Sequence, residues 1–474
     1  MARINTNVSA LIAQRNLNTS YSKLNSTLER LSTGLRVSRG KDDPAGLIVS
    51  ERLRSEISAV NQAIKNTQRA GTIISTTEGA LNEVAALLVS IQDKLVESAN
   101  RGALSDDEIK ANQLQVDSAI ASITRIANST TFAGRALLNG SLDYITSGVS
   151  VNQITALRVT GAQFGTRDYI PVDVNVTTSA QPAELFFTGP VGSQAVTVEV
   201  QGNRGATTLS FVPNASASTI ITAVNAIRDA TGVFATSAAG GGVRFYSDTM
   251  GSKQFVSVRP LPGSGAFATQ DGAGNPDDRV NGRDAVATIN GAQSIGEGNR
   301  LSLRTATLNV ELDLAATFGQ GQTRFAITEG GSLFQLGSQV NSNLQVGVGV
   351  QSVAASQLGN AEIGFLSQIV TGEQFSLING RFQEASDVVT EAIRQVSVLR
   401  GRLGAFEKNT LDTNAAQLGI TAENLSSAES VIRDADFAQE TSQLTRNQVL
   451  VSAGTSVLGL ANQTPQNVLR LLGG

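Results

Sequence analysis

The sequence predicts an α+β protein: long helical arms from both chain ends form a coiled coil or bundle, and a β-rich α+β domain is inserted between them. The placement of proline is the first observation. Seven of the nine prolines fall between Pro171 and Pro276, the residues before them hold only Pro44, and those after hold only Pro465. Because a proline inside a helix costs about 3 kcal/mol, long helices are expected at the two ends and not in the middle. The second observation is the spacing of apolar residues in each part.

The amino-terminal arm carries apolar residues at the spacing of a coiled coil. Its first seam has steps of four and three residues: Leu17, Tyr21, Leu24, Leu28, Leu31 and Leu35. A second seam lies in another phase, which we expect to change near Gly71: Ile74, Leu81, Val84, Leu88, Ile91 and Leu95. Asp42 or Asp43 before Pro44 predicts the start of a second helix, and Ser105 with Glu108 predicts a capping box at the start of a third.

The carboxyl-terminal arm shows the same pattern in steps of seven residues. Its apolar positions fall into three sets: Phe382, Val389, Val396 and Leu403; Leu411, Leu418, Leu425 and Ile432; and, in a shifted phase, Phe437, Leu444, Val451 and Leu458. A single short helix cannot bury such a seam by itself. We therefore expect the two arms to pack against each other as an antiparallel bundle that brings both chain ends together. Periodicity alone fits an ordinary intracellular helical scaffold equally well.

The middle of the chain predicts strands. Four segments alternate apolar and polar side chains: 195–200, 208–212, 242–247 and 308–314. This alternation is typical of half-buried strands. Ile220, Val224 and Ile227 lie at helical spacing between two of these segments, and Gly232 fits the C-cap of that helix. Together they predict one small α+β domain with its own core.

The composition disfavours enzymatic chemistry. Among 474 residues there is no His, no Cys and no Trp. The chain therefore lacks the usual neutral-pH base and the commonest zinc and copper ligand, and it cannot form a thiolate nucleophile or a disulfide. Carboxylate, Lys or Ser chemistry stays open, but we expect no enzyme, no catalytic residue and no bound cofactor. A net charge of −4 gives no reason to expect a nucleic-acid partner.

One acidic loop resembles a metal site in composition only. Residues 271–278 (DGAGNPDD) lack the alternating ligands and the closing Glu of a calcium loop, so we expect a solvated turn and no metal. No run of about 18 apolar residues is present to span a membrane. The first 17 residues lack the charged and apolar parts of a secretory signal peptide. Taken alone, these two absences favour a cytosolic protein.

Both chain ends resemble one family. The amino-terminal motifs are Ile4-Asn-Thr-Asn7, Ala13-Gln14, Asn16-Leu17, Glu29-Arg-Leu-Ser-Thr-Gly-Leu-Arg36, Lys41-Asp-Asp-Pro-Ala-Gly46 and Thr77-Glu-Gly-Ala-Leu-Asn-Glu83. The carboxyl-terminal motifs are Arg433-Asp-Ala-Asp436, Ala453-Gly454, Ala461-Asn-Gln463, Pro465-Gln466, Val468-Leu469 and Leu471-Leu472. In this order they resemble the two signatures of bacterial flagellins. The resemblance covers about the first 140 and the last 110 residues and is highly specific, whereas the middle is only loosely similar.

The resemblance implies a layered architecture. The two ends (1–45 and 432–474) would pair as a coiled coil lining a filament core, longer helices (46–180 and 320–431) would form a shell, and residues 181–319 would form a variable outer domain. It implies a structural subunit of the external helical filament of the bacterial flagellum, which transmits motor torque for swimming. Flagellins leave the cell unfolded through a dedicated secretion channel. An extracellular protein without a cleaved signal peptide is therefore expected, which revises the cytosolic interpretation.

The resemblance also implies partners: further copies of the chain in a helical homopolymer, the hook–filament junction and cap proteins, an export chaperone and the secretion apparatus. We expect the subunit interface to be formed by apolar residues at both ends: Leu17, Tyr21, Leu24, Leu28, Leu31, Leu35, Phe437, Leu444, Val451, Leu458, Val468 and Leu469. An amphipathic end that cannot bury its seam stays disordered until a neighbour supplies the contact. Contacts that do not close into a ring then build a filament.

One shell segment departs from the family. Many flagellins carry Leu-Gln-Arg-Ile-Arg-Glu-Leu there, on a surface that packs between subunits and contacts the Toll-like receptor that senses flagellin. This chain reads LVSIQDK over residues 88–94, so the receptor and packing surface becomes Ser90, Ile91, Gln92, Asp93 and Lys94. Loss of the Arg and Leu anchors predicts weak or no activation of that receptor. A different filament packing is the alternative reason for these residues.

Three other functions share parts of this pattern. A hook–filament junction protein has similar ends, but its central region usually differs, and the carboxyl-terminal match favours the filament subunit. An intracellular coiled-coil scaffold would fold cooperatively as a monomer or dimer. A flagellin with a metallopeptidase insert would need an HExxH helix, which the absence of His excludes.

Overall fold

The computed structural model describes residues 6–472 except 166, 190, 239 and 306, and it describes side chains as far as Gln463. The chain forms two compact units. The first contains residues 1–69, 335–340 and 409–474, and the second contains residues 70–334 and 341–408. The two chain ends thus belong to the same unit, as the predicted antiparallel bundle requires.

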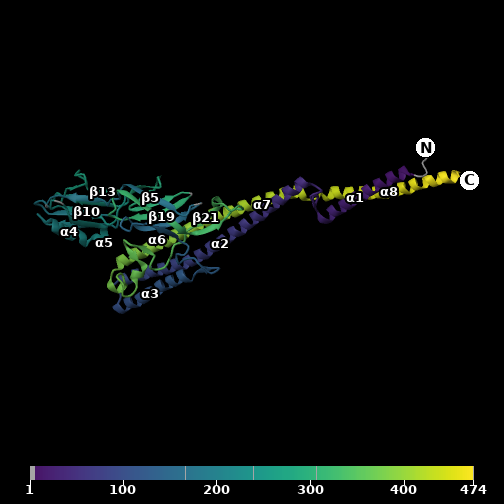
Figure 1. Cartoon of the computed structure of the whole chain (residues 1–474). Coiled ribbons are helices and arrows are strands. Elements are labelled where there is room, and N and C mark those ends of the chain that lie inside the picture. The colour runs from purple at the N-terminus through teal and green to yellow at the C-terminus, as the bar shows by residue number, and fades with distance from the viewer. Residues whose placement is uncertain (1–5, 166, 190, 239, 306, 473–474) are drawn as a thin grey trace. The chain divides into compact units, whose positions relative to one another are not determined.

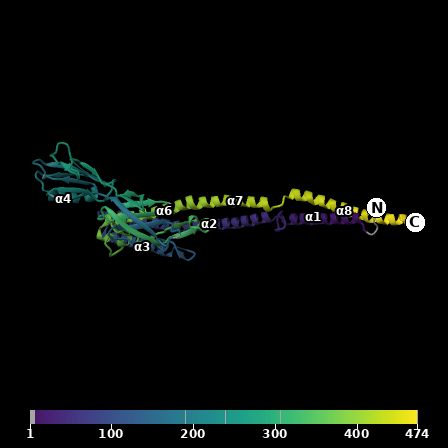
Figure 2. The same cartoon turned by 45° about the horizontal axis from the view of Figure 1, so that its top comes forward.

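The first unit is helical. It contains α1 (Val8–Thr33), the first part of α2 (Pro44–Ala99), α7 (Thr413–Arg433) and α8 (Phe437–Leu472). In Figures 1 and 2, α1 and α8 lie side by side, with the start of α1 near the end of α8. Local chemistry sets the boundaries of these helices. Gly34 ends α1 with a left-handed φ of 73°, and the Asp43 carboxylate accepts from the Gly46 N–H at 2.9 Å to cap α2.

Helix α2 buries one continuous stripe instead of seams in two phases. Buried side chains recur along it at steps of three and four residues: Val60, Ala63, Thr67, Ala70, Ile74, Thr77, Leu81, Val84, Leu88, Ile91, Leu95 and Ser98. The stripe keeps its phase past Gly71, so the shift predicted there is wrong. Thr67 and Thr77 occupy two of its positions because their hydroxyls donate to backbone carbonyls of the same helix, at 2.9 and 2.8 Å.

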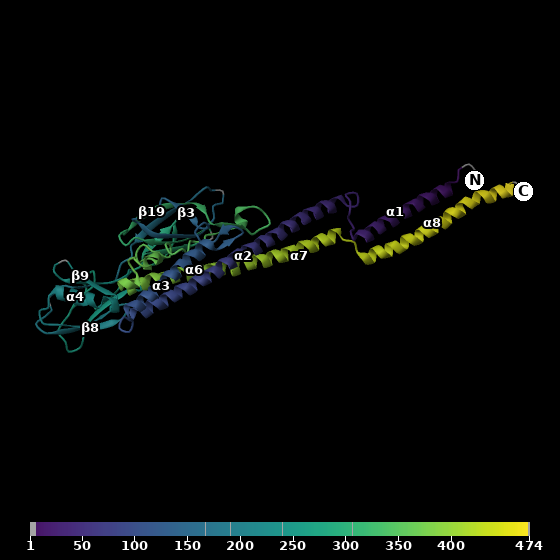
Figure 3. The ribbon, with the colours of Figure 1, turned by 90° about the horizontal axis from the view of Figure 1, so that it is seen from below.

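Helices α3 (Asp106–Ser129) and α6 (Phe382–Phe406) belong to the second unit. Figure 3 shows α3 running along the second part of α2. The predicted capping box is present: the Glu108 N–H donates to Ser105 Oγ at 3.4 Å, and the Ser105 N–H donates to Glu108 Oε2 at 2.7 Å. Short helical turns are η1 (Ser342–Leu344), η2 (Leu366–Ile369) and η3 (Leu377–Asn379), and α6 continues into a π-helical turn, η4 (Glu407–Asp412).

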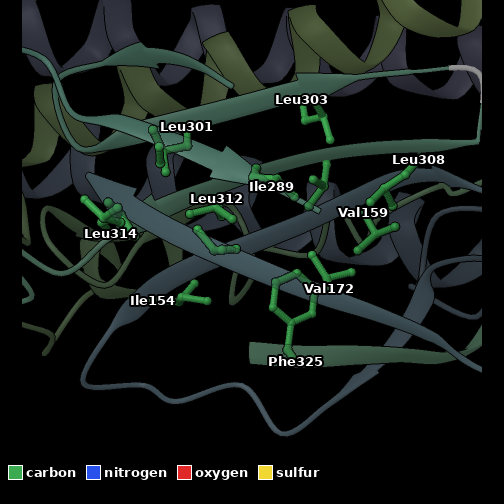
Figure 4. Close-up of a cluster of buried hydrophobic side chains, with 14 of the residues drawn as sticks. Ile154, Val159, Val172, Ile289, Leu301, Leu303, Leu308, Leu312, Leu314 and Phe325 are labelled. Atoms are coloured by element: carbon green, nitrogen blue, oxygen red, sulfur yellow. The ribbon is translucent and has the colours of Figure 1, made fainter. Parts of the chain in front are cut away.

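A first pair of sheets encloses one β core. The five-stranded sheet has the order β15 (Ala292–Gln293), β14 (Val286–Ile289), β5 (Ile170–Thr178), β19 (Gly321–Gly330) and β3 (Tyr144–Ser147). The four-stranded sheet has the order β16 (Ile295–Glu297), β17 (Arg300–Arg304), β18 (Leu308–Leu314) and β4 (Ile154–Ala162). Alternate side chains of both sheets meet between them, among them Leu301, Leu312, Val172 and Phe325 (Figure 4).

A second pair of sheets encloses another core. One sheet has the order β12 (Thr269–Gln270), β6 (Glu184–Phe187), β10 (Val243–Ser247) and β9 (Val233–Ser237). The other has the order β13 (Arg279–Asn281), β11 (Phe255–Pro260), β7 (Val196–Gln201) and β8 (Ala206–Phe211). Helix α4 (Ala217–Ala226) buries Ile220 and Val224 in this core, and the turn α5 (Arg228–Thr231) ends at Gly232 with φ 75°, which confirms the predicted C-cap.

Three two-stranded pairs complete the strands of the described residues: β1 (Thr131–Phe132) with β2 (Arg135–Ala136), β20 (Ser332–Gln335) with β21 (Gln345–Val348), and β22 (Gly359–Asn360) with β23 (Gly364–Phe365). Every described strand pairing within the four larger sheets is antiparallel.

The middle of the chain therefore has two cores where the sequence predicted one. Buried residues of the first core come from 144–180 and 285–327, and those of the second come from 183–267. The second domain is inserted into the first, and Leu308–Leu314 belongs to the first. Alternation identifies a strand but not the sheet that it joins, so a single outer domain over 181–319 combines one whole domain with part of another. Gln181 and Arg283 close the insertion with backbone hydrogen bonds of 2.8 and 2.9 Å.

Candidate subunit interface

Helices α1 and α8 form an antiparallel pair built from the two ends of the chain. At one end of the pair, Asn7 Nδ2 donates to the carbonyl of Ala461 at 2.8 Å. At the other end, Arg30 Nη1 lies 3.1 Å from Glu440 Oε1. The predicted antiparallel pairing of the two arms is confirmed for these helices.

The faces that meet between α1 and α8 combine large and small side chains. Buried or half-buried positions along α1 and its C-cap include Ala10, Ala13, Leu17, Ser20, Leu24, Thr27, Arg30, Leu31 and Gly34, and those along α8 include Glu440, Leu444, Asn447, Val451, Gly454, Leu458 and Ala461. Of the predicted interface residues, six lie on this seam: Leu17, Leu24, Leu31, Leu444, Val451 and Leu458. Small residues between them let the two backbones approach closely.

Other predicted interface residues point away from the seam. Tyr21, Leu28 and Phe437 keep 44, 46 and 59 % of their surface exposed. The expectation that all these residues share one seam is therefore wrong. Residues 20 and 21 lie three and four positions after Leu17, so either could face α8, and it is the small Ser20 that does. The exposed residues belong to what we call the outward apolar set of α1 and α8: Val8, Leu11, Ile12, Tyr21, Leu28, Phe437, Val449, Leu450, Val457 and Leu460. Each of these side chains is more than 40 % exposed in the described part of the chain.

Four polar residues lie on the seam, where the sequence predicted apolar ones: Thr27, Arg30, Glu440 and Asn447. Asn447 Nδ2 donates to Thr27 Oγ1 at 3.3 Å, and both residues are buried. Arg30 and Glu440 form the ion pair already described, and the Glu440 side chain is 6 % exposed. Sequence reasoning missed them because polar residues are usually assigned to the surface. Their helical spacing was the signal that could have found them: Thr27 follows Leu24 by three residues and precedes Arg30 by three, and Glu440 and Asn447 lie four residues before and three after Leu444.

A short antiparallel bridge joins the points where the chain leaves these two helices. Leu35, the last residue of the predicted amino-terminal seam, pairs with Asp434, and the Arg36 N–H donates to the carbonyl of Arg433 at 2.7 Å. The Arg433 side chain then lies 3.2 Å from Glu51 on α2. The helix breaks at 34–43 and 434–436 are thereby tied together. Val468 and Leu469, also predicted for the interface, lie outside the residues whose side chains are described.

The predicted receptor and packing segment lies on α2 in the second unit, and part of it faces solvent. Ser90 and Asp93 are exposed. Lys94 Nζ lies 2.7 Å from Glu97 Oε2, with 28 % of the lysine side chain exposed. Val89 and Val96 beside them are also exposed. These residues form a mixed polar and apolar surface on this helix.

Two members of the same segment face inward. Ile91 is fully buried because it belongs to the continuous stripe of α2. It is therefore removed from the predicted receptor and packing surface. Gln92 is half-buried, and its Nε2 donates to Ser386 Oγ on α6 at 2.9 Å. The exposed part of the segment is thus centred on Ser90, Asp93 and Lys94.

The second unit contains a charged contact between a sheet and a helix. Arg300 on β17 lies 2.8 Å from Asp313 and 3.5 Å from Glu391 on α6. Burial alone would raise the pKa of Glu391, but hydrogen bonds from Arg394 and Gln395 and the charges of Arg394 and Arg300 outweigh it and lower that pKa. The pair is therefore ionised at neutral pH.

The described residues show no arrangement suited to metal binding. No group of three or more His, Cys, Asp and Glu side chains among them could hold a metal ion. In the acidic loop, Asp271 accepts backbone bonds from Ala273 and Asn275 at 2.9 and 2.8 Å, so this carboxylate closes its own turn. Among the helices described, none is long and apolar enough to cross a membrane.

Comparison with known proteins gives consistent matches. Two family models match the chain: the bacterial flagellin N-terminal helical region over residues 4–143 and the C-terminal helical region over residues 386–472. B-type flagellin of Pseudomonas aeruginosa is 32 % identical over 99 % of both chains. Flagellin of Salmonella typhimurium and flagellin A of Helicobacter pylori are 29 % and 26 % identical with the same coverage.

Solved structures give weaker likenesses. FliC from Burkholderia pseudomallei is 16 % identical and covers 72 % of this chain and 99 % of that one, with a TM-score of 0.24. The flagellar junction protein FlgL from Legionella pneumophila is 11 % identical and covers 82 % of this chain and 100 % of that one, with a TM-score of 0.29. Scores at this level do not establish a shared arrangement of elements.

Proposed function

The chain belongs to the bacterial flagellin family and is a structural subunit of the flagellar filament. From this premise we propose that α1 and α8 together form the surface through which a subunit joins its neighbours. The outward apolar set carries the proposal. The two helices satisfy their seam by pairing with each other, and yet the outward apolar set stays exposed. Burial of these side chains between subunits would contribute roughly 25 cal/mol per Å² of apolar surface, and contacts that do not close into a ring extend into a filament.

The interface includes the residues predicted from the sequence, in two roles. Leu17, Leu24, Leu31, Leu444, Val451 and Leu458 hold α1 to α8 within a subunit. Tyr21, Leu28 and Phe437, with the outward apolar set, contact neighbouring subunits. Leu35 lies at the bridge between the helix breaks, and Val468 and Leu469 extend the interface toward the end of α8. In the filament the ends form an inner layer (1–45 and 432–474). The helices within 46–180 and 320–431 form the shell, and the two β domains, which include the strands of those ranges, lie outermost.

The family is structural, and the chain has no catalytic role or cofactor in this proposal. It acts outside the cell, where the filament transmits the torque of the motor. Its partners are further copies of itself, the junction and cap proteins at the two ends of the filament, and the export chaperone and secretion apparatus before assembly. It is a weak agonist, or none, of the flagellin-sensing Toll-like receptor, because Ser90 and Lys94 replace the arginine and leucine anchors.

The experiment substitutes the outward residues and leaves the seam unchanged. Tyr21→Ser with Leu28→Ser should abolish or strongly shorten filaments, because it removes apolar contacts with neighbours. The matched control is Asn18→Ser with Asn25→Ser, which changes two exposed polar residues of the same helix. Both purified proteins are mixed with short filament seeds and viewed by electron microscopy. Filaments of normal length from the first variant would refute the proposed interface.

A further inference from the structure

Helix α6 has two faces of opposite character. Its buried apolar face is Ala385, Val388, Val389, Ala392, Val396, Leu399 and Leu403. Its other face carries Asp387, Glu391 and Arg394, spaced by four and three residues along one side of the helix. We call these three residues the charged stripe. They meet the β domains through charges.

Three ion contacts cross from the charged stripe to the β domains. Glu391 lies 3.5 Å from Arg300 on β17. Arg394 lies 3.9 Å from Glu311 on β18. Asp387 lies 3.8 Å from Arg204, in the turn between β7 and β8 of the second β domain. All three distances exceed the 2.7–2.9 Å of a direct charged hydrogen bond, so these are looser Coulombic contacts.

The arginines and carboxylates nearest this contact have closer partners on their own side. Arg300 lies 2.8 Å from Asp313 of its own sheet, and Arg204 lies 2.9 Å from Asp248 of its own domain. On the helix, Arg394 lies 2.6 Å from Glu391. Breaking an ion pair is costly mainly when it leaves a buried charge without a partner. Separation at this contact leaves these local pairs intact.

The same pattern holds for the remaining two carboxylates of the contact. Glu311 lies 3.4 Å from Arg300 and 3.8 Å from Arg158, both on its own sheet. Asp387 accepts a hydrogen bond of 3.1 Å from Gln383 on its own helix. When the contact opens, water replaces only the weak ion contacts across it, because each charge keeps its closer local partner. The free energy of opening is therefore smaller than the number of charges suggests.

The other end of α6 holds the β domains more firmly. Leu142 and Val350, on the two chain segments that lead into the first β domain, form an antiparallel bridge. Arg402, near the end of α6, donates from Nη2 to the carbonyl of Gly349 at 2.8 Å. Burial lowers the pKa of Arg402 to about 10, and Asp143 and Glu311 partly offset this. From Arg402 to Asp387 the helix extends about 22 Å, so this region can serve as a pivot for the charged stripe.

We propose that the β domains dock reversibly on α6, closed through the charged stripe at neutral pH and low salt, and open as a body about the Leu142–Val350 bridge at high salt or in acid. Both β cores and the helices stay folded in the open form. Such a device lets the outer part of each subunit move against its helices without unfolding.

Acid opens the contact because the carboxylates lose charge while the arginines keep theirs. The charged groups of this contact come from both sides. Helix α6 contributes Glu384, Asp387, Glu391 and Arg394. The β domains contribute Arg158, Arg300, Glu311, Asp313, Arg204 and Asp248, and Glu362 lies before β23. Burial raises the pKa of Asp387, partly offset by Arg204, so Asp387 loses its charge at a higher pH than an exposed aspartate. Against the effect of burial, the pKa of Glu391 is lowered, mainly by hydrogen bonds from Arg394 and Gln395, so Glu391 keeps its charge to a lower pH than an exposed glutamate. The contact should weaken between about pH 5 and pH 3.

The test uses fluorescence transfer between two labels on the full-length monomer. The chain has no Cys, so Ala103→Cys near the start of α3 and Ala273→Cys in the second β domain, both exposed, accept the dyes. Transfer should change as NaCl rises from 0.05 to about 1 M, where the Debye length falls to about 3 Å, and again between about pH 5 and pH 3. Asp387→Asn with Glu391→Gln should raise the open-to-closed ratio about tenfold, or about 1.4 kcal/mol, and lose the salt response.

The matched control is Asp173→Asn with Glu184→Gln, which removes two ion pairs elsewhere on the β domains, with Arg324 and Arg244. It should keep the closed state and its salt response. Circular dichroism of the same samples reports folding. Unchanged transfer at high salt and at pH 3 in a folded protein would overturn the proposal. Loss of β signal at the same pH as the change in transfer would also overturn it, because the domains would then unfold instead of opening as a body.

Discussion

Gly454 of α8 lies directly against Leu17 of α1: a Cβ at position 454 would be 3.1 Å from Leu17 Cδ1 and 3.7 Å from Leu17 Cβ. The two helices therefore approach closely at a position where one has no side chain. Such small residues let the backbones of paired helices approach, and an added side chain must displace its neighbour.

Gly454→Leu should separate α1 from α8 and destabilise the pair by about 1–3 kcal/mol. Gly459→Leu on the same helix is the matched control, because a Cβ there meets nothing within 4 Å. Leucine in place of a helical glycine should itself favour the helix by roughly 0.5–1 kcal/mol. Thermal unfolding of the helical ends, followed by circular dichroism, compares the two proteins. Equal stability of both variants would show that the close approach at Leu17 has no energetic role.

The buried Thr27–Asn447 pair predicts an asymmetry between its two members. The Thr27 hydroxyl donates to the carbonyl of Lys23 at 3.0 Å and accepts from Asn447. Thr27→Val leaves the amide of Asn447 buried without this acceptor and should cost about 1–3 kcal/mol. Asn447→Leu leaves the hydroxyl with its donor bond to Lys23 and should cost less or stabilise the pair. The double variant should be close to neutral, because replacing both partners by apolar groups removes the unsatisfied polar atom.

The measurement is a double-mutant cycle by thermal unfolding of the α1–α8 pair. Asn16→Leu with Thr445→Val, which makes the same exchanges at exposed positions of the two helices, is the control. The interpretation is wrong if Thr27→Val and Asn447→Leu cost the same and their effects add.

How far the sequence could predict this seam follows from its residue types. Leu17, Leu24 and Leu31 fall on it because leucine at heptad spacing indicates a buried face. Tyr21 and Leu28 do not, because a helix offers neighbours at both three and four residues, and only a partner's shape selects between them. Large side chains turned outward and small ones turned inward are the reverse of an isolated coiled coil. The sequence of one helix does not determine this arrangement. The partner helix determines which small residues face inward, and a neighbouring subunit would explain why large residues face outward.

The β region shows a second limit. Alternation in 195–200, 208–212, 242–247 and 308–314 predicted strands, and each of these segments overlaps a strand of the structure. The sheet that each strand joins depends on contacts between residues far apart in the chain. Leu308–Leu314 pairs with Ile154–Ala162, more than a hundred residues earlier. The insertion of one domain in another is therefore invisible to a local pattern.

Removal of the inserted domain gives a test of this division. Replacing residues 182–282 by a short Gly-Ser turn should leave the first β core intact, because Gln181 and Arg283 already lie side by side. Filaments should still form and should be thinner. Deleting 183–300 instead removes Ala285, Ala287 and Ile289 from the first core, and should destabilise it by several kcal/mol, since each large core truncation costs about 2–5 kcal/mol.

Electron microscopy of assembled filaments and thermal unfolding of monomers measure both deletions. The first deletion is the control for the second, because both remove the same second core. If the 182–282 replacement folds and never polymerises, the inserted domain holds essential contacts between subunits. If both deletions unfold alike, the two cores are not independent.

The exposed part of residues 88–94 predicts how strongly this protein activates the flagellin-sensing Toll-like receptor. Ser90 offers one hydroxyl where the family's arginine offers five donors. Lys94 places an ammonium, held by Glu97 at 2.7 Å, where an apolar side chain would be buried. Loss of anchors each worth about 2 kcal/mol or more predicts weak activation or none. Ser90→Arg with Lys94→Leu should therefore raise activation at least about tenfold, or about 1.4 kcal/mol, in a reporter-cell assay with purified monomer.

Two controls separate receptor binding from a general effect of charge and packing. Ala86→Arg adds an arginine at another exposed position of α2, one turn before Ser90, and should leave activation unchanged. Ile91→Val removes one methylene from the buried stripe and should lower stability by about 0.5–1.5 kcal/mol without changing activation, because Ile91 is not on the surface. Nanomolar activation by the unmodified protein would refute the prediction outright. Filaments of the Ser90→Arg with Lys94→Leu variant show whether these residues also serve filament packing. If the filaments are disordered while receptor activation rises, Ser90 and Lys94 serve packing, and weak receptor activation is a consequence of that role.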